Sequence, residues 1–180
     1  MKAIAGIFVL LIVVIGAYLL FGTRSPSVEG ARYANATYGI SFEYPSAHAL
    51  QEREVGDAHR YHYSITLIDK EALATLPQNG EGPPTISVDI FQNNLDQLSI
   101  EQWVRGTNFS NFKLSPDGLL ASTTVAGVPA LSYTWDGLYR GESTVFTHKD
   151  NVIMLSVTYL SRDDQIRADF ARVLSSLTLF

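Results

Sequence analysis

The feature that most constrains this chain is an uncharged apolar segment near its start, residues 3–22, AIAGIFVLLIVVIGAYLLFG. A helix rises about 1.5 Å per residue, so twenty residues span about 30 Å, the thickness of the hydrocarbon core of a bilayer. The segment therefore predicts one transmembrane signal-anchor helix over residues 1–22, with the lipid bilayer as its partner through residues 3–22. It divides the chain into an anchor and a soluble remainder.

Two other interpretations of this segment remain. A cleavable signal peptide has a shorter apolar core, about 7 to 15 residues, and ends at a small-x-small site, whereas this run ends in Leu19, Leu20 and Phe21. A pilin-like N-terminus would begin at Gly6 and carry a Glu five residues later, where this chain has Leu11. A lipid-modified N-terminus is excluded because the chain contains no cysteine.

The charges that flank the segment do not decide its orientation. Lys2 lies on one side, and Arg24 and Arg32 lie on the other, so the positive-inside rule favours neither direction strongly. A two-residue N-terminal tail is easily kept in the cytoplasm while a long C-terminal part is exported. We therefore expect a single-pass cell-membrane protein with an extracytoplasmic C-terminal domain.

The rest of the chain divides into a linker and one domain. Residues 23–36 are rich in Ser, Pro, Gly and Ala and predict a flexible tether, and residues 37–180 are enough for one domain with a substantial core. Without Lys2 and Arg24, 11 of the 13 basic residues remain against 18 acidic ones, a net charge near −7. Because this charge repels phosphates, we expect no nucleic-acid partner.

The pattern of apolar residues in the domain predicts mainly strands. Alternation predicts strands over residues 38–45, 61–68 and 85–91, and the Pro- and Gly-rich residues 69–84 predict a long loop. The second half predicts a meander of four strands, over residues 119–126, 130–135, 138–148 and 152–159. Asp136-Gly137 between apolar runs predicts a type I′ hairpin turn.

Two helices are expected among these strands. Ser99 and Gln102 form a capping-box pattern that predicts a short helix ending near residue 106. A second helix is expected from Ser161, with Asp163 and Asp164 favouring its N-terminus. Its apolar stripe consists of Ile166, Phe170, Val173, Leu174 and Leu177. Hairpins together with an amphipathic C-terminal helix indicate an α+β domain, a twisted antiparallel sheet covered by helices.

Three segments resemble the PsbP-like family. Residues 38–46 (YGISFEYPS) resemble its opening strand, residues 126–130 (AGVPA) its central hairpin, and residues 170–180 (FARVLSSLTLF) its final helix and closing residues. The resemblance covers most of residues 37–180 and implies an α/β/α sandwich in an exported binding or assembly accessory that is not an enzyme. His48 departs from the family, which often has Trp there, and the metal- and photosystem-binding segments of photosynthetic members have no counterpart here.

The residues themselves offer little catalytic or metal chemistry. His59 and His62 are three apart in a strand region, so they point to opposite faces and cannot share a metal; the other histidines are His48 and His148. A Gly-x-Ser-x-Gly elbow is missing from the sequence, and Asp163-Asp164 is better explained as helix capping than as a catalytic pair. We therefore expect no catalytic residues, no metal and no cofactor.

The aromatic residues around Asp136-Gly137 are the candidates for a partner contact. By alternation Tyr133 and Trp135 share one face of a strand, which predicts core packing. If the hairpin protrudes, Trp135 and Tyr139 would suit a contact with an envelope protein, because such residues are enriched in binding hot spots. The loop over residues 69–84 is a second candidate.

The main functional hypothesis is therefore a membrane-anchored extracytoplasmic binding or assembly accessory. One alternative is a small-molecule or cation receptor with a cleft between sheet and helix, whose rim would carry Glu52, Glu54 and Asp57. A further alternative is an exported hydrolase, which requires titratable groups with displaced pKa values in a pocket.

Overall fold

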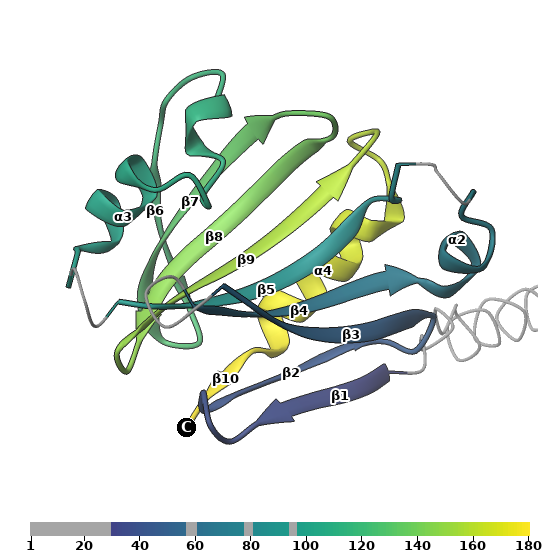
Figure 1. Ribbon diagram of the computed structural model, residues 1–180, viewed down its shortest axis with the longest axis horizontal. Coiled ribbons are helices and arrows are strands. Elements are labelled where there is room, and N and C mark those ends of the chain that lie inside the picture. The colour runs from purple at the N-terminus through teal and green to yellow at the C-terminus, as the bar shows by residue number, and fades with distance from the viewer. Residues whose placement is uncertain (1–29, 57–60, 78–80, 94–96) are drawn as a thin grey trace, which may run out of the picture.

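The computed structural model describes residues 30–56, 61–77, 81–93 and 97–180. Two antiparallel sheets are built from these residues (Figure 1): a seven-stranded sheet in the order β3-β4-β5-β9-β8-β7-β6 and a three-stranded sheet in the order β1-β2-β10. The elements in chain order are β1 (Gly30–Asn35), β2 (Ile40–Pro45), β3 (His48–Val55), β4 (His62–Asp69), α2 (Lys70–Ala74), β5 (Thr85–Gln92), α3 (Ile100–Gly106), the short 3-10 helix η1 (Phe112–Leu114), β6 (Ala121–Val125), β7 (Val128–Asp136), β8 (Arg140–His148), β9 (Asn151–Tyr159), α4 (Gln165–Ser176) and β10 (Thr178–Leu179).

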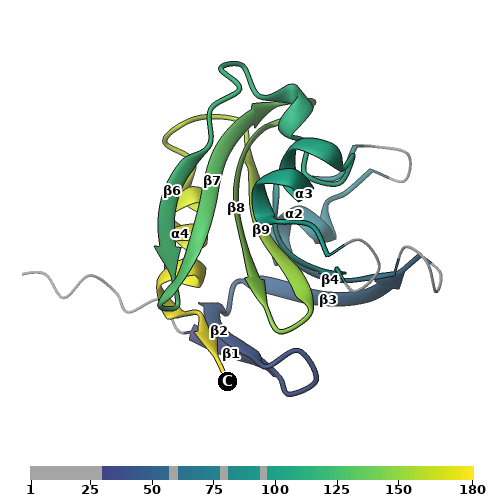
Figure 2. The same cartoon turned by 90° about the vertical axis from the view of Figure 1, so that its left-hand side faces the viewer.

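The large sheet is covered by helices on both faces. Figure 2 shows α4 on one side of the sheet and α3 on the other. The small sheet packs beside α4, where the backbone N–H of Glu43 donates to Ser176 Oγ at 2.9 Å. This arrangement confirms the expected α+β class, an antiparallel sheet covered by helices.

The main core lies between the large sheet, α4 and the small sheet. Successive side chains of a strand point to opposite faces of the sheet. Every second residue of the central strands β5 and β9 therefore points into this core. The small sheet adds Ile40 and Phe42, and α4 adds one apolar stripe. Its most buried members include Ile86, Val88, Ile90, Ile153, Leu155, Val157, Phe146 and Val173.

A second, smaller core lies on the opposite face, under α3. The helix begins as expected: Gln102 N–H donates to Ser99 Oγ at 3.3 Å, and Ser99 N–H donates to Gln102 Oε1 at 3.1 Å, which completes the capping box. This start directs Trp103 and Val104 onto the sheet. There they pack with Phe91, Tyr133, Trp135, Val145, Val152 and Met154.

Two strands differ from the expectation. Residues 30–35, which were expected to belong to the tether, form β1 and pair with β2 from Gly30↔Pro45 to Asn35↔Ile40. Residues 48–55 form β3, a strand that was not expected, because its exposed polar run gives no apolar alternation. The expected loop over residues 69–84 contains α2, whose start is capped by Asp69 through the backbone N–H of Ala72 at 2.8 Å.

The hairpin turns also differ. Asp136 pairs with Arg140, so β7 and β8 are joined by three residues, and neither Asp136 nor Gly137 has a positive φ. The expected hairpin is confirmed, but the expected type I′ turn at Asp136-Gly137 is wrong. Two consecutive positive φ values instead occur at Ala126 (49°) and Gly127 (81°), which form the two-residue turn between β6 and β7.

The last helix begins at Gln165 and not at Ser161. Asp164 is its N-cap, but its Oδ2 accepts hydrogen bonds from the backbone N–H groups of Leu160 (2.7 Å) and Ser161 (2.8 Å). The carboxylate thus closes the turn that precedes the helix, which holds residues 161–164 outside it.

The expected anchor over residues 1–22 and most of the expected tether lie outside the described residues. Within residues 30–56, 61–77, 81–93 and 97–180, no helix combines the length and apolar character needed to cross a bilayer.

Candidate functional site

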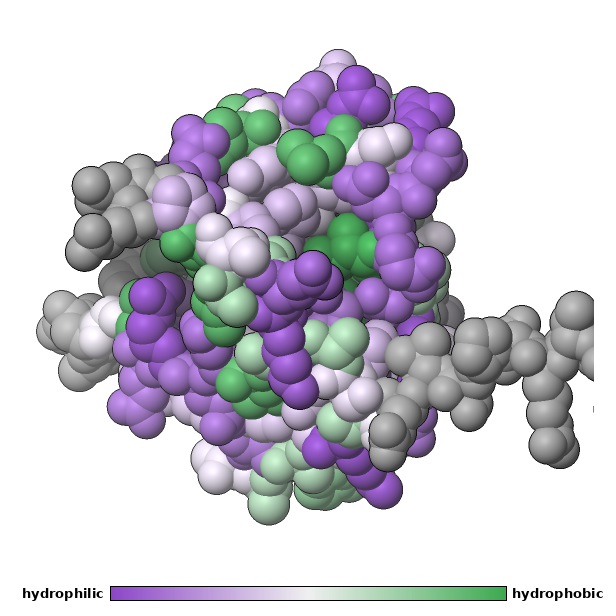
Figure 3. Space-filling view, turned by 90° about the vertical axis from the view of Figure 1, so that its right-hand side faces the viewer, coloured by the Kyte–Doolittle hydropathy of each residue, from purple (hydrophilic) through white to green (hydrophobic). Residues whose placement is uncertain are grey.

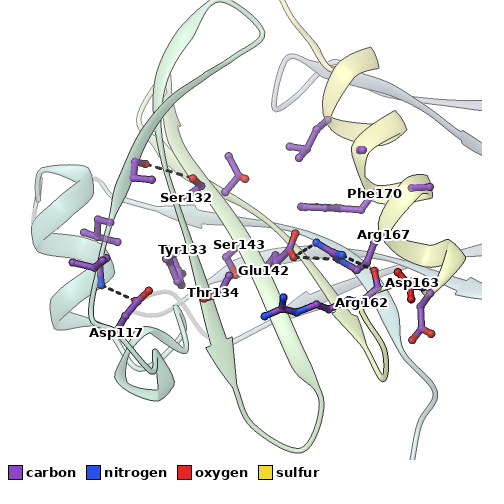
Figure 4. A pocket seen from close by; sticks show the side chains of 18 of the residues that line it. Asp117, Ser132, Tyr133, Thr134, Glu142, Ser143, Arg162, Asp163, Arg167 and Phe170 are labelled. Atoms are coloured by element: carbon purple, nitrogen blue, oxygen red, sulfur yellow. Dashed lines mark hydrogen bonds and ion pairs between the residues drawn. The ribbon is translucent and has the colours of Figure 1, made fainter.

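A groove of about 920 Å³ opens between the outer strands of the large sheet and α4 (Figure 4). Its floor comes from β7 and β8, where Ser132 pairs with Thr144 and Thr134 pairs with Glu142. These four side chains lie on the same face of the sheet as the core residues Ala130 and Phe146, because they are two or four residues away along each strand.

The walls of the groove differ in character. One wall is α4, with Phe170, Ala171 and Leu174, and the opposite side is formed by residues 119–121 at the start of β6. The groove exists because the apolar stripe of α4 packs over the centre of the sheet and against the small sheet. On the face of the sheet that lines the groove, β7 carries small hydroxyl side chains. Among the described elements, no helix covers these side chains.

An ion pair fixes α4 to the floor of the groove. Glu142 Oε1 accepts hydrogen bonds from Arg167 Nη2 at 2.5 Å and Arg167 Nε at 3.1 Å, and it also accepts one from the Tyr159 hydroxyl at 3.2 Å. Arg167 Nη1 donates to the carbonyl of Arg162 at 2.6 Å, and its guanidinium lies 4.9 Å from the centre of the Tyr159 ring. Figure 4 shows this pair bridging α4 and the sheet. The Arg167 side chain is therefore held in one orientation.

The carboxylates at the rim serve the local backbone. Asp117 accepts hydrogen bonds from the N–H of Leu119 at 3.0 Å and the hydroxyl of Ser115 at 3.1 Å, and these bonds lower its pKa. Asp164 holds the turn before α4. The described lining residues offer hydroxyl groups, apolar side chains, the Glu142–Arg167 ion pair and the charged side chains of Arg162 and Asp163, but no histidine that could activate a serine.

Trp135 and Tyr139 do not form one exposed patch. Trp135 is 8% exposed and points away from the groove, and its Nε1 donates to Ser143 Oγ at 2.9 Å. Tyr139 is partly buried and its hydroxyl donates to the carbonyl of Gly82 at 2.7 Å. Core packing of Tyr133 and Trp135 is thus confirmed. A partner contact by Trp135 and Tyr139 stays a prediction, which the burial of Trp135 disfavours.

The end of the molecule that carries the β7–β8 turn has no single apolar surface. Figure 3 shows separate green patches set among purple polar side chains on this side. Leu138, which is 70% exposed, lies in the β7–β8 turn, and Leu160, which is 69% exposed, directly follows β9. The groove is therefore the better candidate for a contact surface.

The histidines do not converge. His48 is buried with its Nε2 3.7 Å from Asp169 Oδ2, and His62 stacks on Phe91 with ring centres 4.8 Å apart. Burial lowers the pKa of His62. His148 ends β8, and His59 lies outside the described residues. In the part of the chain that the structure describes, no three His, Asp or Glu side chains are placed to hold a metal ion.

The acidic residues expected at the rim of a sheet–helix cleft lie elsewhere. Glu52 and Glu54 belong to β3, at the edge of the large sheet opposite β6, and Asp57 lies outside the described residues. Glu52 Oε1 accepts hydrogen bonds from the hydroxyls of Tyr33 (2.5 Å) and Tyr63 (2.6 Å), which lower its pKa. The structure does not bring the carboxylates of Glu52 and Glu54 to the groove.

The groove residues were not found from the sequence. Glu142 and Arg167 are 25 positions apart, on a strand and a helix. The available signal was the polar side of residues 130–135, where Ser132 and Thr134 alternate with Tyr133 and Trp135. That alternation assigns faces to a strand, but it does not show which element covers each face.

Comparison with known proteins bears on the fold. No family model matches the chain, and no curated protein matches its sequence. Among solved structures, the solution structure of the cyanobacterial PsbP protein CyanoP from Synechocystis sp. PCC 6803 is similar, with a TM-score of 0.56, 14% identity, and coverage of 89% of this chain and 99% of that one. LpqN, described as involved in cell envelope biogenesis of Mycobacterium tuberculosis, aligns at 15% identity over 88% of this chain and 87% of its own, with a TM-score of 0.38. The match to CyanoP shows that the chain has a PsbP-like fold.

Proposed function

We propose that this protein is a single-pass membrane protein whose extracytoplasmic PsbP-like domain is a non-catalytic binding or assembly accessory. In this proposal the groove between β7, β8 and α4 receives a segment of an envelope protein. The observation that carries the proposal is the open groove itself, whose helical wall is locked by Glu142 and Arg167. Residues 3–22 supply the anchor that keeps the domain at the membrane.

The chemistry of the groove favours a polypeptide segment. Its volume of about 920 Å³ is at the upper end of ligand sites, which are usually about 300–1,000 Å³. The hydroxyls of Ser132, Thr134 and Thr144 can bond backbone groups, while Phe170 and Leu174 offer apolar contact. Arg167 is already held by Glu142, the carbonyl of Arg162 and the ring of Tyr159. A segment that docks against α4 therefore has few protein side chains to order, and preorganisation of this kind favours affinity.

Site-specific cross-linking in native membranes tests the accessory function. A photo-reactive amino acid is placed in the full chain at Thr134, on the exposed floor of the groove, and in a matched variant at Gln51, which is exposed on β3. We expect one envelope protein to cross-link from position 134 and not from position 51. The Arg167→Gln variant, which releases the wall, should reduce that product.

Two results would refute the proposal. Quantitative labelling that returns no protein product from position 134, or the same products from both positions, removes the groove as a docking site. For the anchor, alkaline extraction should leave the full-length chain in the membrane pellet, and protease added outside the cell should digest the domain. Recovery of the full-length chain as freely dissolved cytosolic protein would contradict the membrane assignment.

A further inference from the structure

The two edge strands of the large sheet, β3 and β6, differ in the charge of their exposed side chains. β3 carries exposed Glu52, Arg53 and Glu54, and charged side chains on an edge strand oppose pairing with another strand. β6, at the other edge, has the sequence ASTTV and is exposed at four of its five residues. Figure 2 shows β6 at the outer edge of the sheet, next to β7. Residues 118–127, which include β6, contain no charged side chain. The β6 edge therefore lacks the charges that protect the β3 edge.

The register of the hairpin shows which backbone groups of β6 are available. Val125 pairs with Val128 across the two-residue turn, which makes this the hydrogen-bonded closing pair. Residues 121, 123 and 125 then direct their backbone groups toward β7. Ser122 and Thr124 direct theirs away from the sheet. The outer edge of β6 thus offers two N–H and two C=O groups, placed symmetrically about Thr123.

We propose that β6 pairs antiparallel with β6 of a second copy of this chain, with the two-fold axis at Thr123. Ser122 of each copy exchanges both backbone hydrogen bonds with Thr124 of the other, giving four bonds. Thr123 then faces Thr123 of the second copy in a non-hydrogen-bonded pair. The two seven-stranded sheets become one continuous sheet.

The side chains along β6 fit this pairing. Ala121 lies opposite Val125 of the second copy, and Ser122 lies opposite Thr124, so each cross-strand pair is small or β-branched. No like charges meet, although the protein as a whole is acidic, with a net charge of −5. Leu119, which is 68% exposed, falls beside Gly127 of the second copy. The second copy is therefore an occupant that matches the edge in register and brings no opposing charge to it.

A cysteine scan tests the two-fold axis directly. The chain has no cysteine, so Thr123→Cys introduces the only thiol. Non-hydrogen-bonded antiparallel partners have Cα atoms about 4.5 Å apart, within the range for a disulfide. In the full chain in mild detergent, we expect T123C to form a disulfide-linked dimer at least about tenfold faster than the controls, because only that site meets the geometry. The controls are Gln51→Cys, exposed on the opposite edge, and Thr134→Cys, exposed on β7.

Two further variants separate loss of pairing from loss of folding. Thr124→Pro removes an N–H that points outward, and proline is tolerated on the free side of edge strands, so the fold should persist while the dimer is lost. Thr123→Lys leaves the backbone intact and places two positive charges opposite each other at the axis. Sedimentation velocity should show a dimer for the unchanged chain and a monomer for both variants, with unchanged circular dichroism.

The proposal fails if T123C cross-links no faster than Q51C or T134C, or if the unchanged chain sediments as a monomer at about 100 μM, a concentration well above most specific dissociation constants. A dimer that survives Thr123→Lys also refutes it. Pairing through β6 does not depend on the accessory function. Failure of the dimer leaves cross-linking from position 134 unchanged, and failure of that cross-linking leaves the dimer unchanged.

Discussion

Gly141 is the position where one added methyl group should disturb the second core most. It is the cross-strand neighbour of Trp135. A Cβ at this position would lie 2.2 Å from Cε2 and Cζ2 of the indole and 2.7 Å from Cδ2. Real side-chain contacts do not approach this closely, so the indole of Trp135 must move in the Gly141→Ala variant.

The expected cost follows from two losses. Overpacking of a buried site costs about 1–3 kcal/mol. Tilting the indole also breaks the bond from Trp135 Nε1 to Ser143 Oγ, 2.9 Å long, which is worth about 0.5–1.5 kcal/mol. Replacing Gly by Ala within a strand recovers a few tenths to about 1 kcal/mol. The free energy of unfolding should therefore fall by about 2–3 kcal/mol.

Urea unfolding followed by far-ultraviolet circular dichroism measures this change. With a slope of about 2 kcal/mol per molar urea, the midpoint should fall by about 1–1.5 M. The control is the same substitution in a Trp135→Ala background, where the indole is gone and Gly141→Ala should be close to neutral. A loss below about 0.5 kcal/mol in the unchanged background, or equal losses in both backgrounds, would show that the indole and Gly141 are not coupled.

Three other substitutions test the fold and the groove. Ser99→Ala removes the N-cap of α3 and should lower the unfolding free energy by about 1 kcal/mol, measured by urea unfolding; Ser99→Thr should retain most of it. In the Glu52→Gln variant, the melting temperature should fall less steeply than in the unchanged chain as the pH is lowered from 7 to 3. The folded pKa of Glu52 lies below its ordinary 4.5, so its stabilisation is present above pH 4.5 and is lost as the pH falls through the lowered value. Arg167→Gln should cost about 1 kcal/mol, because the Glu142 pair is partly exposed, and Arg167→Lys should recover less than half since lysine lacks the two-pronged donor. Full stability of the glutamine variant in low salt would contradict the role assigned to this pair.

The elements found from the sequence are those whose signals are local. Strand β5 alternates with period two because one of its faces lies in the main core, and Ile86, Val88 and Ile90 show this directly. The capping box at Ser99 is formed by residues three apart, so it needs no information from the rest of the fold. The burial of Tyr133 and Trp135 on one face follows from the same alternation.

The elements that were missed depend on partners far away in the chain. β1 is short and polar in part, and it is a strand because β2 pairs with it along its whole length. β3 is an edge strand with an exposed, charged run, which reads as a solvated turn without its neighbour β4. The turn at Asp136 was misassigned because the pairing of Asp136 with Arg140 leaves three residues, and not two, to connect the strands.

The sequence by itself determined the order of the central strands along the chain, the faces that they bury and the start of α3, because these depend on residues within a few positions of one another. Only the tertiary structure decided that α4 covers the centre of the sheet and leaves the groove beside it, and that Glu142 meets Arg167 there. The physical reason is that these features follow from which buried faces pack together. The stripe of Phe170, Val173 and Leu177 in α4 specifies that the helix buries one side, but the shape of the assembled sheet selects the place where that side fits.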